Sequence, residues 1–406
     1  MKSALRPAVL LAILLVGAYP GFGQDGGSPP RPVYRSAHYE IYGGDAAAAE
    51  RIAAGLEGCF EIFSRLFRFK APSPLRVRLI PNPAAYDDYV AGLLGEKREG
   101  AVYLHYRREN SRELVINNGP AAGGSVPAAD SWNWAVPYQA FVQYLRAFIP
   151  SPPSWIQRGF ALYFSGLSFS GGREISYREH LSWLGMVKAG PLPPVREILL
   201  ADAEYSGAEG PAAPAFDALS WSLASFFLNS GNEDYFRSLL ECFMLLNPEA
   251  GAAENSRILT DRLGEWNGFE NLDRDYRAYL DSRRTFSELM DLGRRAYLSG
   301  DGEAARPFFL EALDLRPGHY APYYYLGLGA YGNGNWEEAE RYYLQSLEGG
   351  ADRGPVYYAL GLNAAAALNR DRAREYLDAA VQADPSRYRE KAESLINRLP
   401  GPPRIP

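Results

Sequence analysis

The sequence predicts an α+β protein in which a small mixed sheet with packed helices precedes an all-α solenoid. In the first half, short segments that alternate apolar and polar residues are interleaved with longer segments of helical periodicity, and these two periods favour strands and helices respectively. From Phe286 onward, the pair Leu-Gly returns every 34 residues. A fixed period of that length is typical of stacked helical hairpins.

Length, composition and charge are those of a globular protein. The chain has 406 residues, which is enough for two or three domains with sizeable cores. Hydrophobic residues make up 47% and charged residues 22% of it, with no bias toward disorder or a fibrous repeat. The formal net charge of −6 indicates no basic face, so we expect no nucleic-acid partner.

Residues 1–23 have the pattern of a secretory signal peptide. Lys2 and Arg6 precede an apolar run over 8–18, and small residues follow it. The run is too short to span a bilayer comfortably, and no later segment is apolar enough to do so. We therefore expect an exported protein of the bacterial periplasm, or a secreted one, without a membrane span in the mature chain. A flexible leader is expected over 24–34.

Two cysteines, Cys59 and Cys242, would then lie in an oxidising compartment. One interpretation is a disulfide between them. The other is that both are small apolar core residues, because each stands among apolar neighbours. The sequence does not place two Cα atoms within disulfide reach, so both interpretations stay open, but we expect no metal site on these thiols.

The segment ahead of residue 118 changes repeatedly between strand and helix patterns. Period-2 alternation predicts the strands, and apolar residues at helical spacing predict the helices. The expected elements are, in order, a strand over 37–42, a helix over 46–67, a strand over 75–80, a short helix over 86–93, and strands over 101–106 and 113–117.

Two helical segments follow, at 136–145 and 154–164, separated by a Pro-rich link. The first contains Gln-Ala-Phe-Val-Gln, and the second reads Ser-Trp-Ile-Gln-Arg-Gly-Phe-Ala-Leu-Tyr-Phe. This pair resembles the active-site region of the gluzincin metallopeptidases, most closely the peptidase MA-like family, in which a helix with HExxH is followed by one reading W-[LI]-x-E-G-x-A-x-[YF]. The strand–helix–strand order before it and the Trp-Ser helix over 216–228 also resemble that family. The resemblance implies a zincin-like domain over 35–282.

On that frame, every residue that would bind or activate zinc is replaced. Gln139 and Gln143 occupy the positions of the first and second ligands, and Arg158 occupies that of the third. Ala140 occupies the position of the general base. A gluzincin needs three ligands and a general base. Gln is a poor zinc ligand, Ala accepts no proton, and Arg brings positive charge toward the cation. We therefore expect a pseudoenzyme with no catalytic residue, no metal and no cofactor.

Arg158 has two interpretations. In one, its guanidinium fills the metal position and donates to the side-chain carbonyls of Gln139 and Gln143. In the other, it is exposed on an unrelated helix. A metal site elsewhere is not expected, because the chain has four histidines and no two of them share a helical spacing; they are His38, His105, His180 and His319.

The 34-residue period extends over 286–388 as three repeats. Small residues return in register at Ala305, Ala339 and Ala373, where they let two helices approach closely. This pattern is identified as the tetratricopeptide repeat. A capping helix and tail are expected over 389–406.

In tetratricopeptide arrays, the first helix of each repeat lines a concave groove that binds peptides or partner proteins. Rigid aromatic rings in such a groove are suitable anchors for an extended or helical segment. The alternative is that several of the tyrosines pack only between repeats. The side chains that the register places in the groove are Tyr297 with Tyr331, Tyr324 with Tyr358, and Leu328 with Leu362.

These observations predict an exported, non-catalytic scaffold protein of the cell envelope, whose repeats bind a partner protein or peptide. One alternative is a zinc-dependent metallopeptidase with atypical ligands. The other is a structural adaptor whose first domain is unrelated to the peptidases.

Overall fold

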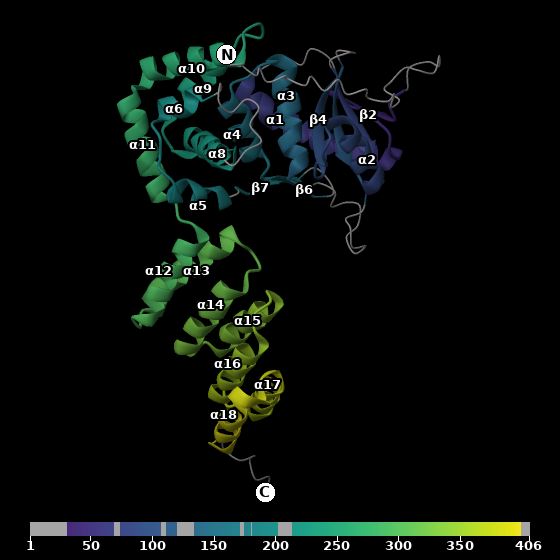
Figure 1. The fold of residues 1–406 in the computed structure, drawn as a ribbon. Helices are drawn as coiled ribbons and strands as arrows, with labels where there is room; N and C mark the ends of the chain where they lie inside the picture. The colour runs from purple at the N-terminus through teal and green to yellow at the C-terminus, as the bar shows by residue number, and fades with distance from the viewer. Residues whose placement is uncertain are drawn as a thin grey trace, which may run out of the picture. The chain divides into compact units, whose positions relative to one another are not determined.

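The computed structural model describes residues 31–68, 74–106, 111–119, 134–170, 174–179, 181–201 and 213–398. The predicted signal peptide, most of the predicted leader and the tail after residue 398 lie outside the described residues. The chain divides into two compact units (Figure 1). Unit 1 comprises residues 1–150 and 164–178, and unit 2 comprises residues 151–163 and 179–406.

Unit 1 is built on a small mixed sheet. The outer strands β1 and β4 are antiparallel to their neighbours, and the three inner strands are parallel. A separate antiparallel pair is formed by β6 (Leu167–Ser170) and β7 (Glu174–Tyr177). The five strands of the main sheet, in the spatial order β1-β2-β3-β5-β4, are β1 (Tyr34–Arg35), β2 (Tyr39–Tyr42), β3 (Leu75–Ile80), β5 (Ser111–Asn117) and β4 (Ala101–Tyr106).

Helices cover the sheet of unit 1. Helices α1 (Ala46–Phe67) and α3 (Ala135–Phe148) pack together and against its strands, and α2 (Pro83–Leu94) packs against a different set of side chains on β4 and β5. The core between α1 and α3 is aromatic, because the ring of Phe63 lies 5.3 Å from that of Phe141. The predicted helix over 46–67 is confirmed. It begins where the carboxylate of Asp45 accepts the N–H of Ala48.

His38, just before β2, is tied to α1 by Glu57. The Glu57 carboxylate accepts the backbone N–H of His38 at 2.7 Å and lies 2.6 Å from its Nδ1. Burial by itself raises the pKa of Glu57, but the hydrogen bonds from His38 and its neighbourhood outweigh burial and hold that pKa below its ordinary value of 4.5. A carboxylate whose pKa is lowered by folding stabilises the folded state above its unfolded-state pKa. That contribution is lost as the pH falls through the folded-state pKa.

We expect Glu57→Gln to lower the free energy of unfolding at pH 7, and its difference from the wild type to shrink as the pH falls below about 4.5. Urea unfolding at pH 7 and at pH 3 measures both values. Glu61→Gln, which removes a carboxylate on the exposed side of the same helix, is the matched control. A difference between Glu57→Gln and the wild type that does not change with pH would contradict the assignment.

The described part of unit 2 is helical. Its first helices surround α8, whose residues Trp221 and Phe226 are buried together with Trp155 of α4. Among the described residues, no helix combines the length and the apolar composition that crossing a membrane requires. These helices are α4 (Ser154–Phe164, of which residues up to 163 belong to unit 2), α5 (Ser182–Ala189), α6 (Val195–Leu200), α8 (Ala213–Asn229), α9 (Glu233–Phe243), α10 (Ala252–Asn267) and α11 (Phe269–Ser282).

From Phe286 the chain forms successive helix pairs, which we call the repeat region (286–398). The members of each pair, α12 with α13, α14 with α15 and α16 with α17, pack closely together. The bounds are α12 (Phe286–Leu298), α13 (Gly302–Leu315), α14 (Tyr320–Gly332), α15 (Trp336–Glu348), α16 (Arg353–Ala366), α17 (Arg370–Ala383) and α18 (Pro385–Arg398).

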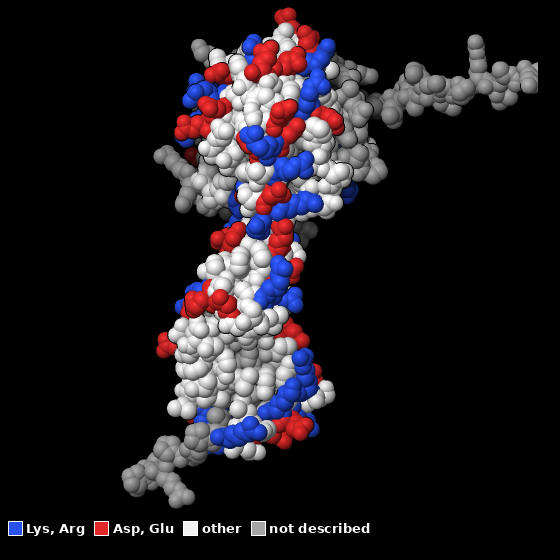
Figure 2. Space-filling view, turned by 90° about the vertical axis from the view of Figure 1, so that its left-hand side faces the viewer, with Lys and Arg blue, Asp and Glu red and all other residues white. Residues whose placement is uncertain are grey.

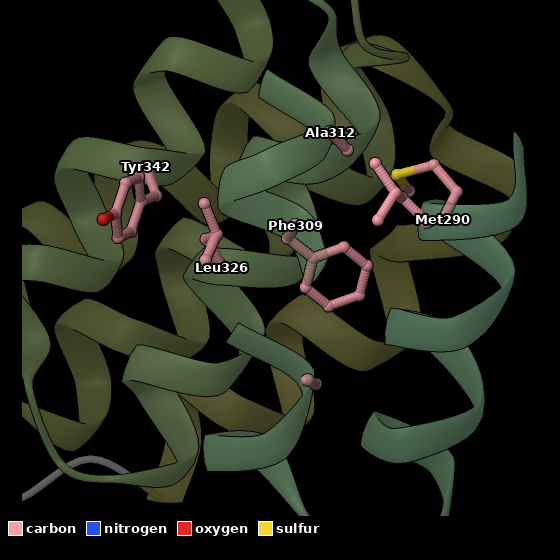
Figure 3. Packing of buried hydrophobic residues seen from close by; sticks show 7 residues of the cluster. Met290, Phe309, Ala312, Leu326 and Tyr342 are labelled. Carbon is pink, nitrogen blue, oxygen red and sulfur yellow. The ribbon is translucent and has the colours of Figure 1, made fainter. Parts of the chain in front are cut away.

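The repeated Leu-Gly pairs have a packing reason. A Cβ added at Gly327 would lie 2.6 Å from the ring of Tyr343 on the partner helix, and Gly293 meets Phe309 in the same way. Each glycine therefore lets the second helix of its pair approach. Figure 3 shows the resulting core, with Phe309 between Met290 and Leu326. The long run of helices after a small mixed sheet confirms the predicted α+β fold class at this level.

The two cysteines lie in different helices. Cys59 of α1 and Cys242 of α9 are both free and buried. Burial raises the pKa of each thiol to about 12, so each is an uncharged apolar core residue at neutral pH. This is the second of the two interpretations that the sequence left open.

Candidate functional sites

Gln139, at the position of the first expected zinc ligand, lies on α3 and bonds to the edge of the sheet. Its side-chain carbonyl accepts the backbone N–H of Tyr103, on β4, at 3.1 Å. β4 is an outer strand, and an outer strand exposes backbone groups that would otherwise pair with another chain. Gln139, at the position of a gluzincin's first zinc ligand, therefore pairs with a backbone N–H of this outer strand.

Gln143, at the position of the second expected ligand, is committed to a second strand. It is only 2% exposed, and its Nε2 donates to the backbone carbonyl of Arg76, on β3, at 2.8 Å. Its Oε1 is buried and accepts no hydrogen bond within the described residues. Ala140, at the position of the general base, is fully buried, so this helical turn contributes packing and two amide contacts.

Arg158, at the third-ligand position, lies on α4 in unit 2. Its Nη1 donates to Oδ1 of Asp217, on α8, at 2.7 Å, and both side chains are about one quarter exposed. The guanidinium also lies 5.9 Å from the ring centre of Phe216. The predicted hydrogen bonds from Arg158 to the two glutamines would join unit 2 to unit 1 and stay a prediction. Within its own unit, the guanidinium has an acidic partner that the sequence analysis missed.

These donors do not fit a zinc ion. Two amides and a guanidinium offer no imidazole, thiolate or carboxylate ligand. Across the parts of the chain that are described, no group of three or more His, Cys, Asp or Glu side chains is arranged to hold a metal ion. His38 is engaged with Glu57, and Nδ1 of His319 accepts the N–H of Ala321 at the start of α14. His180 lies outside the described residues.

The second candidate site is the surface formed by the first helix of each pair in the repeat region. All six side chains predicted to line a groove lie on these helices and are half-buried; they are Tyr297, Tyr324, Leu328, Tyr331, Tyr358 and Leu362.

The tyrosines of this surface also contact neighbouring side chains. Lining a groove and packing between repeats therefore describe different sides of the same rings. The ring of Tyr331 lies 5.4 Å from that of Trp336, and the ring of Tyr358 lies 5.3 Å from that of Tyr388. Burial raises the pKa of Tyr297 and of Tyr324. Rings fixed on one side and accessible on the other lose little conformational entropy when a partner binds.

In the second and third helix pairs, charge is distributed unequally between the two helices, whereas α12 and α13 carry four charged residues each. Helix α14 has no charged residue, and α16 has only Arg353. By contrast, α15 carries five charged residues and α17 carries six. Figure 2 shows a broad uncharged area on the repeat region, with charged residues gathered along its border. The part of the first-helix surface that α14 and α16 form is therefore suited to uncharged ligands.

Tyr388 packs beneath this surface, and the sequence analysis did not single it out. It lies in the first turn of α18, is 3% exposed, and packs against Tyr358. A Cβ at Gly354 would lie 2.9 Å from its ring. The 34-residue period could have identified this position, because Tyr388 lies 34 residues after Gly354 and 68 after Tyr320.

Comparison with known proteins adds no family to these observations. A scan against models of known protein families finds no match to this chain, and a search of curated proteins finds none of significance.

Proposed function

We propose that this chain is an exported, non-catalytic protein of the cell envelope that binds a partner protein or peptide on its repeat region. In this proposal, residues 286–388 form three tetratricopeptide repeats, and the preceding part descends from a peptidase MA-like domain. The carrying observation is the first-helix surface of α14 and α16, which is uncharged and presents half-buried tyrosines. Such a surface supports binding of an uncharged segment through aromatic anchors.

The replaced site supports the non-catalytic half of the proposal. Gln139 and Gln143 are each bonded to a strand, and Arg158 is paired with Asp217. A zinc peptidase needs free imidazole and carboxylate ligands at these positions and a carboxylate base beside them. Purified protein that holds zinc stoichiometrically and loses peptide hydrolysis on chelation would overturn this half.

We expect Tyr324→Ala with Tyr331→Ala to weaken partner binding by about tenfold or more for each ring, because buried aromatic anchors carry much of an interface's free energy. Envelope proteins that co-purify with the wild-type chain after chemical crosslinking provide the readout, and each is then tested as a purified partner. Tyr376→Ala, on the charged helix α17, is the control and is expected to retain binding.

The same uncharged surface predicts that binding persists at high salt. Raising the NaCl concentration from 0.1 to about 0.5 M shortens the screening length and weakens charge–charge contacts, but α14 offers none. A partner that dissociates as the salt is raised, or that binds Tyr324→Ala/Tyr331→Ala as well as the wild type, would contradict the proposed surface.

A further inference from the structure

A pocket of about 120 Å³ lies between the first and second helix pairs of the repeat region. Its walls include the rings of Tyr297, Tyr325 and Phe309. The Tyr325 ring stacks on that of Phe309, with centroids 5.0 Å apart, so it is held as a wall. The rim is polar and includes Arg306, which pairs with Glu338 at 3.0 Å.

The next interface along the repeat region fills the corresponding place with side chains. A shift of 34 residues converts Gly302, in this pocket, into Trp336, and Gly329 into Asn363. The indole of Trp336 packs on Tyr331, which is the counterpart of Tyr297. The side-chain amide of Asn363 donates to the backbone carbonyl of Trp336 at 2.8 Å. The pocket therefore lies where the following repeat places an indole and an amide.

Packing does not require glycine at either pocket position. A Cβ added at Gly302 or at Gly329 would meet no atom within 4 Å, and neither glycine has a positive φ. Glycine inside a helix is less stable than alanine. The two glycines therefore keep space open and lower the stability of their helices, although packing does not require glycine at either position.

The charges around the two places match, so charge does not distinguish their occupants. Glu303 of the pocket corresponds to Glu337. The ion pair Arg306–Glu338 corresponds to Glu340–Arg372, in which the charges are reversed and Nη1 of Arg372 lies 2.9 Å from Oε2 of Glu340. An indole is accommodated beside that set of charges in the second interface. In the first, Tyr325 replaces Ala359 and adds a second aromatic wall.

We propose that this pocket receives an aromatic side chain of indole size, carried by the partner segment that binds the repeat region. This inference rests on the proposed function, and Tyr297 connects the two because it belongs both to the first-helix surface and to the pocket wall. Aromatic rings bind one another in offset or edge-to-face geometry. The partner is thereby specified as an uncharged segment with one tryptophan-like anchor.

The test uses the full chain and N-acetyl-tryptophanamide at millimolar concentration, observed by saturation-transfer difference NMR. The wild type is expected to transfer saturation to the indole protons, and Gly302→Trp, which places an indole in the pocket, is expected to abolish the transfer. Gly185→Trp is the control, since a Cβ at Gly185 on α5 also meets no atom within 4 Å. This control is expected to behave as the wild type.

The melting temperature of Gly302→Trp is expected to equal or exceed that of the wild type, because the added ring fills existing space. Should that variant fail to fold, Gly329→Asn, which copies the other side chain of the second interface, decides the question by the same NMR measurement. Absence of transfer in the wild type, or transfer that survives filling, overturns the pocket assignment. Preferential transfer to N-acetyl-argininamide overturns the aromatic occupant in favour of a basic one.

These outcomes are separable from failure of the proposed function. The first-helix surface is tested by Tyr324→Ala with Tyr331→Ala, and neither residue lines the pocket. A partner that binds Gly302→Trp normally but not the tyrosine double variant overturns the pocket alone.

Discussion

Gly159→Ala is expected to destabilise unit 2 by about 3 kcal/mol, although it adds a single methyl group. Gly159 lies on α4 at its crossing with α8. A Cβ there would overlap the backbone carbonyl oxygen of Ser220 and lie 2.7 Å from its carbon. A backbone atom within a helix cannot rotate away as a side chain does, so the two helices have to separate. Their separation would open the core that holds Trp155 and Trp221.

The measurement is urea unfolding followed by tryptophan fluorescence, to which these two buried indoles contribute. Gly185→Ala is the matched control, because it makes the same substitution on helix α5 where an added Cβ meets no atom within 4 Å. It is expected to stabilise the protein by about 0.5–1 kcal/mol, through the better helix propensity of alanine. Equal stability of Gly159→Ala and the wild type would show that the crossing is looser than described.

The contact at Gly159 changes how the degenerate motif is interpreted. The parts of the second-helix pattern that this chain retains are parts that pack: Trp155, Ile156 and Ala161 are all fully buried, and Gly159 permits the helix crossing. The parts that it lacks are those that would bind zinc. Under the proposed descent, selection for helix packing alone would preserve these residues. Their retention is therefore no argument for peptidase activity.

Elements whose periodicity is long enough were predictable from the sequence. The helix over 46–67 and the strands over 75–80 and 101–106 have the predicted bounds, because their burial patterns repeat several times within each element. The short strands β1, β6 and β7 were not predicted, whereas β2 was, because its alternation continues into the residues before it. Strands without such an alternation are fixed by their pairing partners instead.

Partners in the candidate sites were less predictable than the sites themselves. The register of the repeats placed six side chains on one surface, since a repeat fixes the environment of each position. No such rule connects Arg158 to Asp217, which is 59 residues away, or Gln139 to an N–H on β4. These contacts depend on how helices cross and strands pair. Local sequence patterns do not encode that information.

Glu113→Ala is expected to lower the free energy of unfolding by about 3 kcal/mol, because it removes a buried carboxylate that accepts from a guanidinium and two hydroxyls. Glu113 of β5 has a side chain that is 5% exposed. Its Oε1 accepts from Nε of Arg78 at 3.0 Å, from the hydroxyl of Tyr106 at 2.6 Å and from that of Tyr89 at 3.2 Å. Burial disfavours the charged guanidinium, but the Glu113 carboxylate outweighs it and raises the pKa of Arg78. Removing the carboxylate takes this support away, but Arg78 keeps its charge at neutral pH because the ordinary pKa of a guanidinium lies far above 7.

Two further variants separate the charge pair from the hydrogen bonds. Glu113→Gln retains an oxygen for Tyr106 but not the negative charge, and its loss of stability should be smaller than that of Glu113→Ala. Arg78→Met combined with Glu113→Leu removes both charges, and it should recover most of the stability because well-packed apolar residues replace buried ion pairs at little cost. The two tyrosine hydroxyls still bond to each other, at 2.8 Å. Hydrogen exchange of the β3 and β5 amides locates the effect in this sheet. If the double variant is no more stable than Glu113→Ala, loss of the Glu113–Arg78 ion pair is not the cause, and the lost hydrogen bonds to the tyrosines must account for the effect.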